Sequence, residues 1–269
     1  MSDTAPDPAP ARGPEFVQSL ERGLAVIRAF DATSGPLSLS EVARRCGLPR
    51  AAARRFLLTL VELGYVAQEG RGFALRPRVL ELGVAYLSGL SFVEVARPHL
   101  ERLSADVDES ASISVLDGDE VVYVARVPTR RIMSVTIAVG TRLPAWATSM
   151  GRVLLAALPE AELARRLAAP LPAAPTAAVP LDADAVAERI AGARADGFAL
   201  VDEELERGLR SIAVPILDAT GAAIAAINVS TPAARTTVAQ LRERILPRLR
   251  RAADEIHADL RRIGPGGLT

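Results

Sequence analysis

The chain has 269 residues, 49% apolar and 24% charged, which is long enough for two domains and apolar enough for a packed core. This composition excludes a disordered or collagen-like chain. The single cysteine, Cys46, excludes an intrachain disulfide and a site of several thiolates. The N-terminus has no apolar run typical of a signal peptide, and no apolar stretch approaches the roughly 18–20 residues of a membrane span. We therefore expect a cytoplasmic protein that does not enter a membrane.

Charge is distributed unevenly, although the net charge is zero and all 32 basic residues are arginine. Between Phe16 and Leu80, ten arginines stand against five acidic residues, a net charge of +5. From Glu81 to the end, 21 arginines stand against 24 acidic residues, a net charge of −3. A compact basic segment joined to a mildly acidic one suggests that the first contacts a polyanion. An excess this modest also arises by chance, so both interpretations stay open.

The N-terminal part predicts a tail followed by three helices. Residues 1–15 are rich in Ala, Pro and Asp and are expected to form a disordered tail. Ser19 is placed to cap the first helix. Ser38 and Glu41 have the spacing of a capping box, which predicts the start of a second, short helix. Arg50–Leu63 carries its apolar residues on one face and predicts the third helix.

A hairpin and a further helix complete this part of the chain. Tyr65–Ala67 and Phe73–Leu75 predict two short strands around a glycine-containing turn. Three helices followed by a hairpin indicate a winged helix-turn-helix domain over residues 16–76. Residues 77–90 predict a linker helix that leads to the second domain.

Residues 91–263 alternate helices with strands, which indicates an α+β domain around one mostly antiparallel sheet. The predicted helices are Phe92–Val107, Thr148–Leu158, Glu160–Ala168, Ala183–Asp196 and the long Thr236–Ile263. The predicted strands are Ala111–Leu116, Glu120–Val127, Met133–Val139, Phe198–Val201, Arg210–Leu217 and Ala222–Ser230. Residues 264–269 form a short tail.

Arginines gather around the predicted helix-turn-helix. The second helix of such a motif enters the major groove of DNA, where a guanidinium binds guanine or a phosphate. The order of capping, turn, helix and hairpin favours double-stranded DNA as a partner over the alternative, a solvated basic face. The candidate DNA-binding residues are Arg44, Arg45, Arg50, Arg54, Arg55 and Arg71.

The sequence offers little for catalysis. His99 and His257 each lie in an amphipathic helix, where exposed histidines are expected, and neither has a cysteine nearby. No cluster has the spacing of a metal site, and no glycine-rich phosphate loop is present. We therefore expect no catalytic residue, no metal and no cofactor.

One region resembles a small-molecule site. Residues 146–151 precede an apolar helix, and backbone N–H groups at a helix start bind carboxylates. Trp146, the single tryptophan, is a candidate aromatic wall. Asn228 and Ser230 share one face of a predicted strand, either facing solvent or lining a pocket. Periodicity alone favours solvent slightly.

Taken together, these segments resemble the IclR family of bacterial transcriptional regulators over about Phe16–Ile263. Residues 16–23 together with residues 147–152 are most similar to the Pca/Pob branch, whose members regulate protocatechuate, 4-hydroxybenzoate and β-ketoadipate catabolism. The resemblance rests on the order and spacing of Ser19–Leu24, Leu39–Tyr65, Pro77–Gly83, Leu143–Ala156 and Gly208–Pro215.

The resemblance implies a winged helix joined to a GAF-like effector domain, and a homodimer that forms through the DNA-binding half. In this family, dimers also pair into tetramers. The implied effector pocket moves Asn228 and Ser230 from solvent into the site. Two departures are Val201, where the family has an acid, and Asn228, where some members have a serine. Carried over residue by residue, the pocket comprises Ser149, Met150, Leu209, Ser211, Asn228 and Ser230.

The expected function is that of a DNA-binding transcriptional regulator of a catabolic operon. A small carboxylic acid, an aromatic acid or its catabolite, is expected to modulate operator binding. Two other classes remain open: a hydrolase-like enzyme with an appended DNA-binding domain, and a protein-interaction adaptor. Neither explains both the basic helix-turn-helix and the missing nucleophile–base pair.

Overall fold

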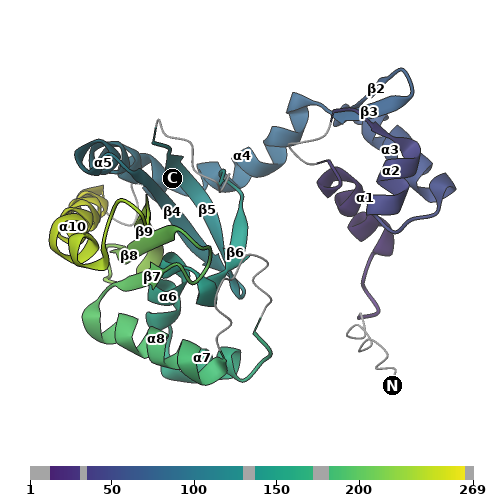
Figure 1. Ribbon diagram of the computed structural model, residues 1–269. Coiled ribbons are helices and arrows are strands. Elements are labelled where there is room, and N and C mark those ends of the chain that lie inside the picture. The colour runs from purple at the N-terminus through teal and green to yellow at the C-terminus, as the bar shows by residue number, and fades with distance from the viewer. Residues whose placement is uncertain (1–12, 31–34, 130–136, 172–181, 264–269) are drawn as a thin grey trace. The chain divides into compact units, whose positions relative to one another are not determined.

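The computed structural model describes residues 13–30, 35–129, 137–171 and 182–263. The chain divides into two compact units, Met1–Tyr86 and Leu87–Thr269, which are described separately (Figure 1). The division falls within the segment that was predicted as a linker. That segment contains a 3₁₀ turn, η1 (Pro77–Val79), followed by helix α4 (Leu80–Ser88).

The first unit is a winged helix, as the sequence predicts. The elements of this unit are α1 (Gln18–Arg28), β1 (Leu37–Ser38), α2 (Leu39–Arg45), α3 (Arg50–Glu62), β2 (Val66–Glu69) and β3 (Gly72–Leu75). Strand β3 lies between β1 and β2 in a three-stranded sheet, and both pairings are antiparallel. Strand β1 is not predicted from the sequence, because its two residues are too few for a pattern to reveal.

Local chemistry explains where these helices begin and end. The Ser38 hydroxyl accepts the Glu41 backbone N–H, and the Glu41 carboxylate accepts the Ser38 backbone N–H at 2.8 Å, which confirms the capping box. The Ser38 hydrogen bonds lower the pKa of Glu41. Gly47 follows α2 with φ of 62°, a conformation that glycine adopts without strain.

The start of the first helix differs from the prediction. Val17, not Ser19, occupies the N-cap position of α1, and no side chain caps this end. The predicted tail is also shorter at its end, because the Phe16 N–H donates to the Gly13 carbonyl at 3.0 Å and closes a turn. Helix α1 therefore begins two residues earlier than a cap at Ser19 would place it. Residues 1–12 lie outside the described residues.

The second unit is built on a six-stranded antiparallel sheet with the strand order β6-β5-β4-β9-β8-β7. Its strands are β4 (Ser110–Asp117), β5 (Glu120–Val127), β6 (Arg142–Pro144), β7 (Ala199–Asp202), β8 (Leu209–Leu217) and β9 (Ala223–Pro232). Its helices are α5 (Ser91–Val107), α6 (Ser149–Ala156), α7 (Glu160–Leu167), α8 (Ala183–Asp196), α9 (Val238–Gln240) and α10 (Leu246–Ile263), with the 3₁₀ turn η2 (Ala145–Ala147) and the π-helical turn η3 (Leu241–Ile245).

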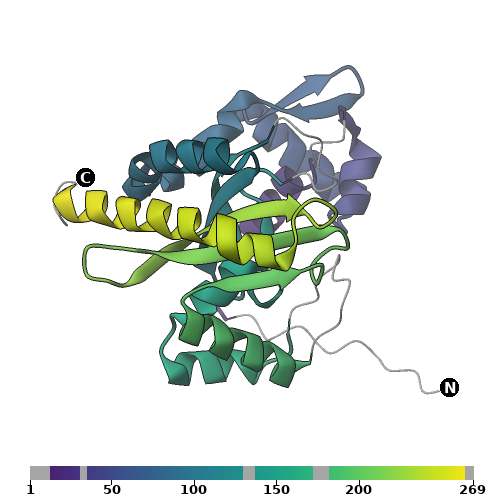
Figure 2. The ribbon, with the colours of Figure 1, turned by 60° about the vertical axis from the view of Figure 1, so that its left-hand side comes forward.

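Helices cover both faces of this sheet, so the unit has three layers (Figures 1 and 2). Helices α5 and α10 lie side by side on one face and share an apolar core with Ile113, Ile212 and Ile227. On the opposite face, α6 packs between the sheet and α8, in a second core that includes Met150 and Ile190. None of the helices in the described part of the chain has the length and apolarity that a bilayer crossing requires.

Two predicted elements of this unit need correction. Most of the predicted strand Met133–Val139 lies outside the described residues, and Ile137–Val139 is not in a strand. The edge strand is instead β6, which pairs with β5. The predicted long C-terminal helix is interrupted by the π-helical turn η3 directly before α10. Pro247 explains this interruption, because it has no N–H to continue the regular ladder.

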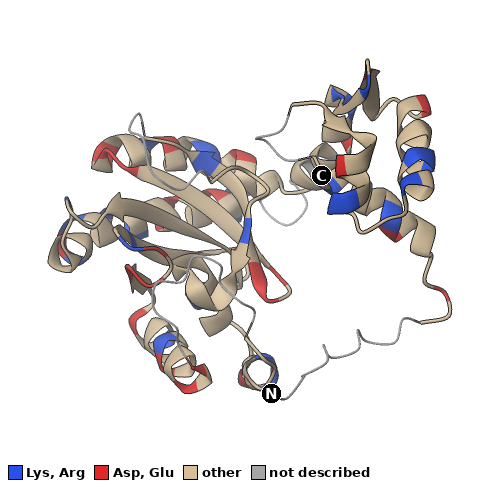
Figure 3. Ribbon diagram, turned by 45° about the vertical axis from the view of Figure 1, so that its right-hand side comes forward, with Lys and Arg blue, Asp and Glu red and all other residues tan. Residues whose placement is uncertain are grey.

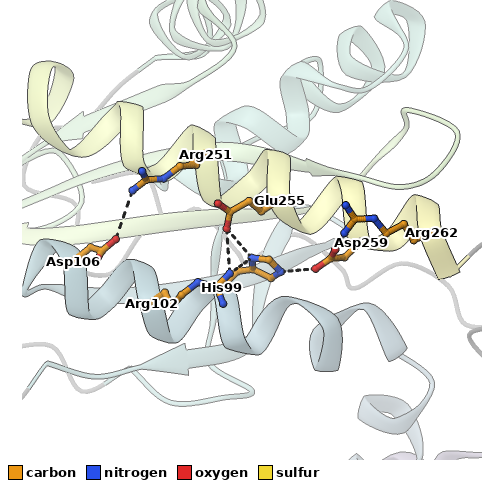
Figure 4. A network of polar contacts seen from close by, with 7 residues as sticks. All are labelled: His99, Arg102, Asp106, Arg251, Glu255, Asp259 and Arg262. Atoms are coloured by element: carbon orange, nitrogen blue, oxygen red, sulfur yellow. Dashed lines mark hydrogen bonds and ion pairs between the residues drawn. The ribbon is translucent and has the colours of Figure 1, made fainter.

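His99 is buried, contrary to the expectation of an exposed helical histidine. It lies on α5 between two carboxylates of α10 (Figure 4). Its Nε2 is 2.8 Å from Asp259 Oδ2, and its Nδ1 is 3.1 Å from Glu255 Oε2. Hydrogen bonding to His99 is the largest cause that holds the pKa values of both carboxyls below their usual range. His257 is half-buried, with Nδ1 3.2 Å from the Leu217 carbonyl oxygen.

Candidate functional site

A small cavity lies in the second unit between the start of α6 and the strands β8 and β9. It brings together six of the seven residues that were predicted to bind a small molecule. Its free volume is about 20 Å³, room for about one water molecule. Its lining residues are Tyr123, Ile137, Ala147, Thr148, Ser149, Met150, Val201, Leu205, Leu209, Ser211, Asn228 and Ser230.

Strand register places the polar residues of the cavity together. Ser211 on β8 stands directly opposite Ser230 on β9, and Asn228 comes two residues before Ser230 on the same strand. Side chains alternate between the two faces of a strand, so Asn228 and Ser230 point to the same face. That face is the one covered by α6, which supplies Ser149.

These side chains form one hydrogen-bonded group. The hydroxyls of Ser149 and Ser211 lie 2.7 Å apart. Asn228 Nδ2 donates to Ser211 Oγ at 2.9 Å and to Ser230 Oγ at 3.1 Å. Asn228 is 3% exposed, and its Oδ1 has no hydrogen-bond partner within the described residues. Among the described residues, the cavity wall therefore contains a buried acceptor without a donor.

The start of α6 forms a second side of the cavity. Thr148 is its N-cap residue and accepts the Gly151 N–H at 2.9 Å. Ser149 and Met150 occupy the first two helical positions, where backbone N–H groups have no acceptor within the helix and favour an anion. Gly151 allows this close packing, because a Cβ there would overlap the backbone of Ala145. The fold places this helix start against the polar strand residues.

Apolar side chains complete the cavity together with the ring of Tyr123, which carries a hydroxyl. Val201, Leu205 and Leu209 come from β7, the β7–β8 loop and β8. Burial raises the pKa of Tyr123 to about 12, which the nearby Arg126 only partly offsets. The phenol is therefore neutral at physiological pH and is able to donate or accept a hydrogen bond.

Trp146 lies outside this cavity, which corrects its prediction as an aromatic wall. It belongs to η2, the 3₁₀ turn before α6, and borders a separate depression with Leu155 and Arg166. Although Trp146 is close to Ser149 in the sequence, its side chain points elsewhere, because η2 and α6 differ in helical geometry. Trp146 contributes instead through its backbone carbonyl, which accepts Arg152 Nε at 2.9 Å.

Several residues of the site were not predicted. Arg152 on α6 is 1% exposed and forms a bidentate ion pair with Glu204. Glu204 precedes Leu205, so this ion pair joins α6 to the loop that lines the cavity. Tyr123 and Val201 sit in apolar strands, where alternation does not reveal which face lines a pocket. No sequence pattern pairs an arginine with an acid 52 residues later.

The predicted DNA-binding residues are exposed on the first unit, and basic positions mark several of its helices (Figure 3). On α3, Ala53, Leu57 and Leu60 are buried, whereas Arg50 and Arg54 are exposed one turn apart. The other four candidate DNA-binding arginines are Arg44, Arg45, Arg55 and Arg71, of which Arg71 lies at the β2–β3 turn.

Arg45 has a structural contact as well. Its Nη1 donates to the Ala29 carbonyl at 2.8 Å, at the end of α1. A guanidinium held there stabilises the C-terminal carbonyls of that helix. Its position is thereby more fixed than that of an unbonded surface arginine.

Within the described ranges, no group of three or more His, Cys, Asp or Glu residues could hold a metal ion.

Two family models match the chain. Residues 84–258 match the C-terminal domain of the bacterial transcriptional regulator IclR, and residues 19–70 match the IclR helix-turn-helix domain. The Pca regulon regulatory protein of Pseudomonas putida is 45% identical over 244 residues, which cover 90% of this chain and 84% of that protein.

Solved structures agree with the family models. A transcriptional regulator from Rhodococcus sp. RHA1 has a TM-score of 0.81 and 55% identity, over 93% of this chain and 100% of that chain. An IclR homologue from Microbacterium hydrocarbonoxydans, in complex with 4-hydroxybenzoate, has a TM-score of 0.77 and 30% identity. The match covers 91% of this chain and 99% of that chain.

Proposed function

The chain belongs to the IclR family of bacterial transcriptional regulators, and we propose that a small aromatic carboxylic acid controls its binding to operator DNA. The first unit binds the DNA, and the cavity between α6, β8 and β9 holds the acid. The observation that carries this proposal is the pairing of a helix start with a buried polar group in one cavity. The controlled genes are those of an aromatic catabolic operon.

The cavity chemistry suits a carboxylate with an apolar body. The N–H groups of Ser149 and Met150 meet the carboxylate at the start of α6, where the helix dipole stabilises negative charge. Ser211, Asn228 and Ser230 supply further hydrogen bonds, and Leu209 packs against the apolar part. Two relatives support an aromatic acid: one regulates a Pca regulon, and one binds 4-hydroxybenzoate.

The cavity must widen to admit such a ligand. A free volume of about 20 Å³ holds about one water molecule, whereas an aromatic acid is several times larger. The acid therefore stabilises a conformation that differs from this one around Leu205 and the start of α6. A ligand that prefers one of two conformations shifts the equilibrium between them, and a coupling of about 1–3 kcal/mol is usual.

The DNA-binding surface is formed by α3 and the hairpin. Arg50 and Arg54 are placed to contact base edges in the major groove, since they lie on the exposed face of the second helix of the motif. Arg44, Arg45 and Arg55 flank this face and contact phosphates. Arg71, at the tip of the hairpin, reaches the backbone or the minor groove.

A homodimer is part of the proposal. Three exposed apolar residues mark α1: Val17 at its N-cap, and Leu20 and Leu24 within the helix. In α4, Leu80 and Tyr86 belong to a second set of exposed apolar side chains. Two such apolar helix faces are typical of protein–protein contacts. A two-fold dimer also doubles the DNA contacts of a small winged helix across a palindromic site.

The DNA-binding part is tested by selecting duplexes from a random library with the full chain, then measuring affinity against salt concentration. The selected site should bind more weakly as salt rises, because phosphate contacts release counterions. Arg54→Ala and Arg50→Ala should each cost about 1–3 kcal/mol. Arg261→Ala removes one exposed charge from α10 and is the matched control. Unchanged affinity in both α3 variants would show that another face of the unit reads DNA.

The effector part is tested with the same DNA site. Benzoate and 4-hydroxybenzoate are added to the complex, and the change in DNA affinity is measured. Asn228→Leu keeps a similar volume but removes the amide, so it should abolish the response and leave DNA binding intact. An unchanged response in this variant would place the acid elsewhere in the molecule.

Sedimentation tests the oligomeric state. We expect a species of at least twice 28.4 kDa at micromolar concentration. Leu20→Glu on α1 places a charge in the exposed apolar face and should dissociate the dimer. A stable monomer of the parent chain would contradict the proposal.

A further inference from the structure

We propose that the buried ion pair between Arg152 and Glu204 is a latch that keeps the effector cavity in its narrow form, and that an acid enters only when this pair separates. The inference rests on the proposed function, because it names the residues that control access to the same cavity. Neither residue lines the cavity, so both act as positioning residues through the two walls that they join.

The ion pair is held by directed hydrogen bonds on both sides of the guanidinium. Arg152 Nη1 and Nη2 donate to Glu204 Oε1 and Oε2 at 3.3 and 2.8 Å, and Arg152 Nε donates to the Trp146 carbonyl oxygen at 2.9 Å. The Arg152 side chain is 1% exposed and the Glu204 side chain 13%. A guanidinium with so little contact with water is stable in this position only while its carboxylate partner stays in place.

The two residues belong to two different walls of the cavity. Arg152 lies on the first turn of α6, two residues after Met150, which lines the cavity. Glu204 lies in the β7–β8 loop, directly before Leu205, which also lines the cavity. A cavity that widens by moving Leu205 away from α6 therefore pulls Glu204 away from Arg152.

The β7–β8 loop has the backbone features of a segment that pivots. Glu203 has φ of 56°, in the left-handed region that non-glycine residues rarely adopt, and Gly208 at the other end has φ of 81°. The Glu203 N–H donates to the Leu209 carbonyl oxygen and the Gly208 N–H donates to Glu203 Oε2, both at 2.9 Å. These bonds close the base of the loop, so residues 204–207 move as one unit about Glu203 and Gly208.

A surface groove next to the ion pair makes its separation possible. Arg152 and Glu204 both line this groove, which has a free volume of about 560 Å³ and is bordered by residues of β7 and α8. Two charges that separate need water in place of each other, because a single buried charge is far less stable than a paired one. The groove supplies that water, and it is the path by which an acid reaches the opened cavity.

Cysteine labelling of the full chain measures how often the cavity opens. Ala147→Cys places a thiol in the cavity wall, at a position that is 2% exposed, in a Cys46→Ser background. When opening is fast relative to the reaction with N-ethylmaleimide, the labelling rate follows the population of the open form. Glu204→Gln should raise this rate about 10- to 100-fold, because it removes the carboxylate that compensates Arg152. Glu204→Asp keeps the charge with a shorter reach, should give a smaller increase, and carries the test if Glu204→Gln does not fold.

Two controls distinguish the latch from a general loss of stability. Glu109→Gln removes the carboxylate of another buried ion pair in the same unit, with Arg235, and should leave labelling at Ala147→Cys unchanged. Ala96→Cys, on α5, reports opening of the core that α5 and α10 share with the sheet. It should be labelled at the same slow rate with and without Glu204→Gln. Circular dichroism establishes that each variant is folded.

The DNA site selected with the parent chain gives a second readout. Without any acid, Glu204→Gln should change DNA affinity in the same direction as benzoate or 4-hydroxybenzoate changes it in the parent. The variant should also bind the acid more tightly, by the factor by which labelling rises, because less free energy is needed to open the cavity. A purely structural role of the ion pair predicts weaker acid binding instead.

Three results would overturn the inference. Labelling at the parent rate in both Glu204 variants would show that the pair does not hold the cavity closed. Equal increases at Ala147→Cys and Ala96→Cys, or an equal increase with Glu109→Gln, would indicate general destabilisation. Weaker acid binding by Glu204→Gln would place the pair in the ligand-bound form. If no acid changes the DNA affinity of the parent chain, the proposed function fails, whereas the labelling rates still decide whether the pair is a latch.

Discussion

The two faces of the six-stranded sheet carry different kinds of side chain, although the same strands supply both. Toward α5 and α10, strands β8 and β9 present large branched residues: Ile212, Val214, Ile216, Ile227 and Val229. Toward α6, the alternate positions of these strands are small or polar: Ser211, Ala213, Ala226, Asn228 and Ser230. One face is filled by its own side chains, and the other leaves room for α6 and a small cavity.

This difference teaches how one strand serves stability and recognition at once. Ile227 and Asn228 are neighbours in sequence, but one is buried in a continuous apolar core and the other ends in a hydrogen-bonded cavity. Branched residues stiffen a strand and fill the space between sheet and helix. Small residues on the reverse face let α6 approach, so its first N–H groups meet the polar side chains of the sheet.

The largest expected effect comes from a change to the filled face. Ile227→Ala should lower the free energy of unfolding by about 2–5 kcal/mol, because it leaves a cavity in a core that is fully buried. The relative affinities for different aromatic acids should stay the same. Urea denaturation and titration of the same protein check both statements. A change in acid preference as large as the change in stability would break the distinction between the two faces.

A smaller effect is expected where α6 meets the 3₁₀ turn before it. Gly151→Ala adds a Cβ that overlaps the backbone of Ala145, so α6 must shift, at a cost of about 1–3 kcal/mol. Acid binding should weaken as well, because the first turn of α6 moves with the helix. Gly192→Ala, on α8, is the control. Its added Cβ has open space, so the variant should be as stable as the parent or up to about 1 kcal/mol more stable.

The smallest expected effect concerns pH on the α5–α10 side. The pKa values of Glu255 and Asp259 are lowered, chiefly by hydrogen bonds with His99, and Arg102 and Arg262 add to this. A carboxyl whose pKa is lower in the folded protein than in the unfolded chain stabilises the fold at pH values above its unfolded pKa. This stabilisation is lost as the pH falls through the pKa of the folded state. Stability should therefore decrease below about pH 4.5.

Denaturation at a series of pH values checks this decrease. Glu255→Gln and Asp259→Asn should each flatten the dependence of the unfolding free energy on pH in the acidic range. Both carboxyls are partly exposed, so the change is modest. The control is Glu160→Gln, at the start of α7 on the other side of the unit. An equally flattened curve in the control would show that the network on α5 and α10 has no special role.

Much of the fold could be predicted because its signals are local. The capping box of Ser38 and Glu41, the apolar face of α3 and the hairpin of β2 and β3 depend only on nearby residues. The interruption before Pro247 and the short strand β6 were missed, because one depends on helix register and the other has three residues. Burial of His99 was missed because its partners lie about 160 residues away.

The site was predictable mainly through the family resemblance. The alternation of side chains along a strand predicts that Asn228 and Ser230 share one face. It does not indicate whether that face meets solvent or lines a pocket. The resemblance to known regulators predicts a pocket at these positions, and in the structure Ser149, Ser211 and Asn228 lie within hydrogen-bond distance of one another. Trp146 and Arg152 show the limit of such reasoning, since the direction of each side chain depends on the path of η2 and α6.

The small size of the cavity has a consequence for measured affinity. If only a fraction of molecules adopts the wider, binding-competent form at any moment, the apparent dissociation constant exceeds the intrinsic one by the inverse of that fraction. A shorter side chain in the cavity wall then has two opposing effects. It removes contacts with the acid, and it raises the fraction of molecules in the binding-competent form. Leu205, which comes from the β7–β8 loop and lines the cavity, is where these effects compete most directly. A shorter side chain there is expected to accelerate association with the acid, even where the final complex is held by fewer contacts.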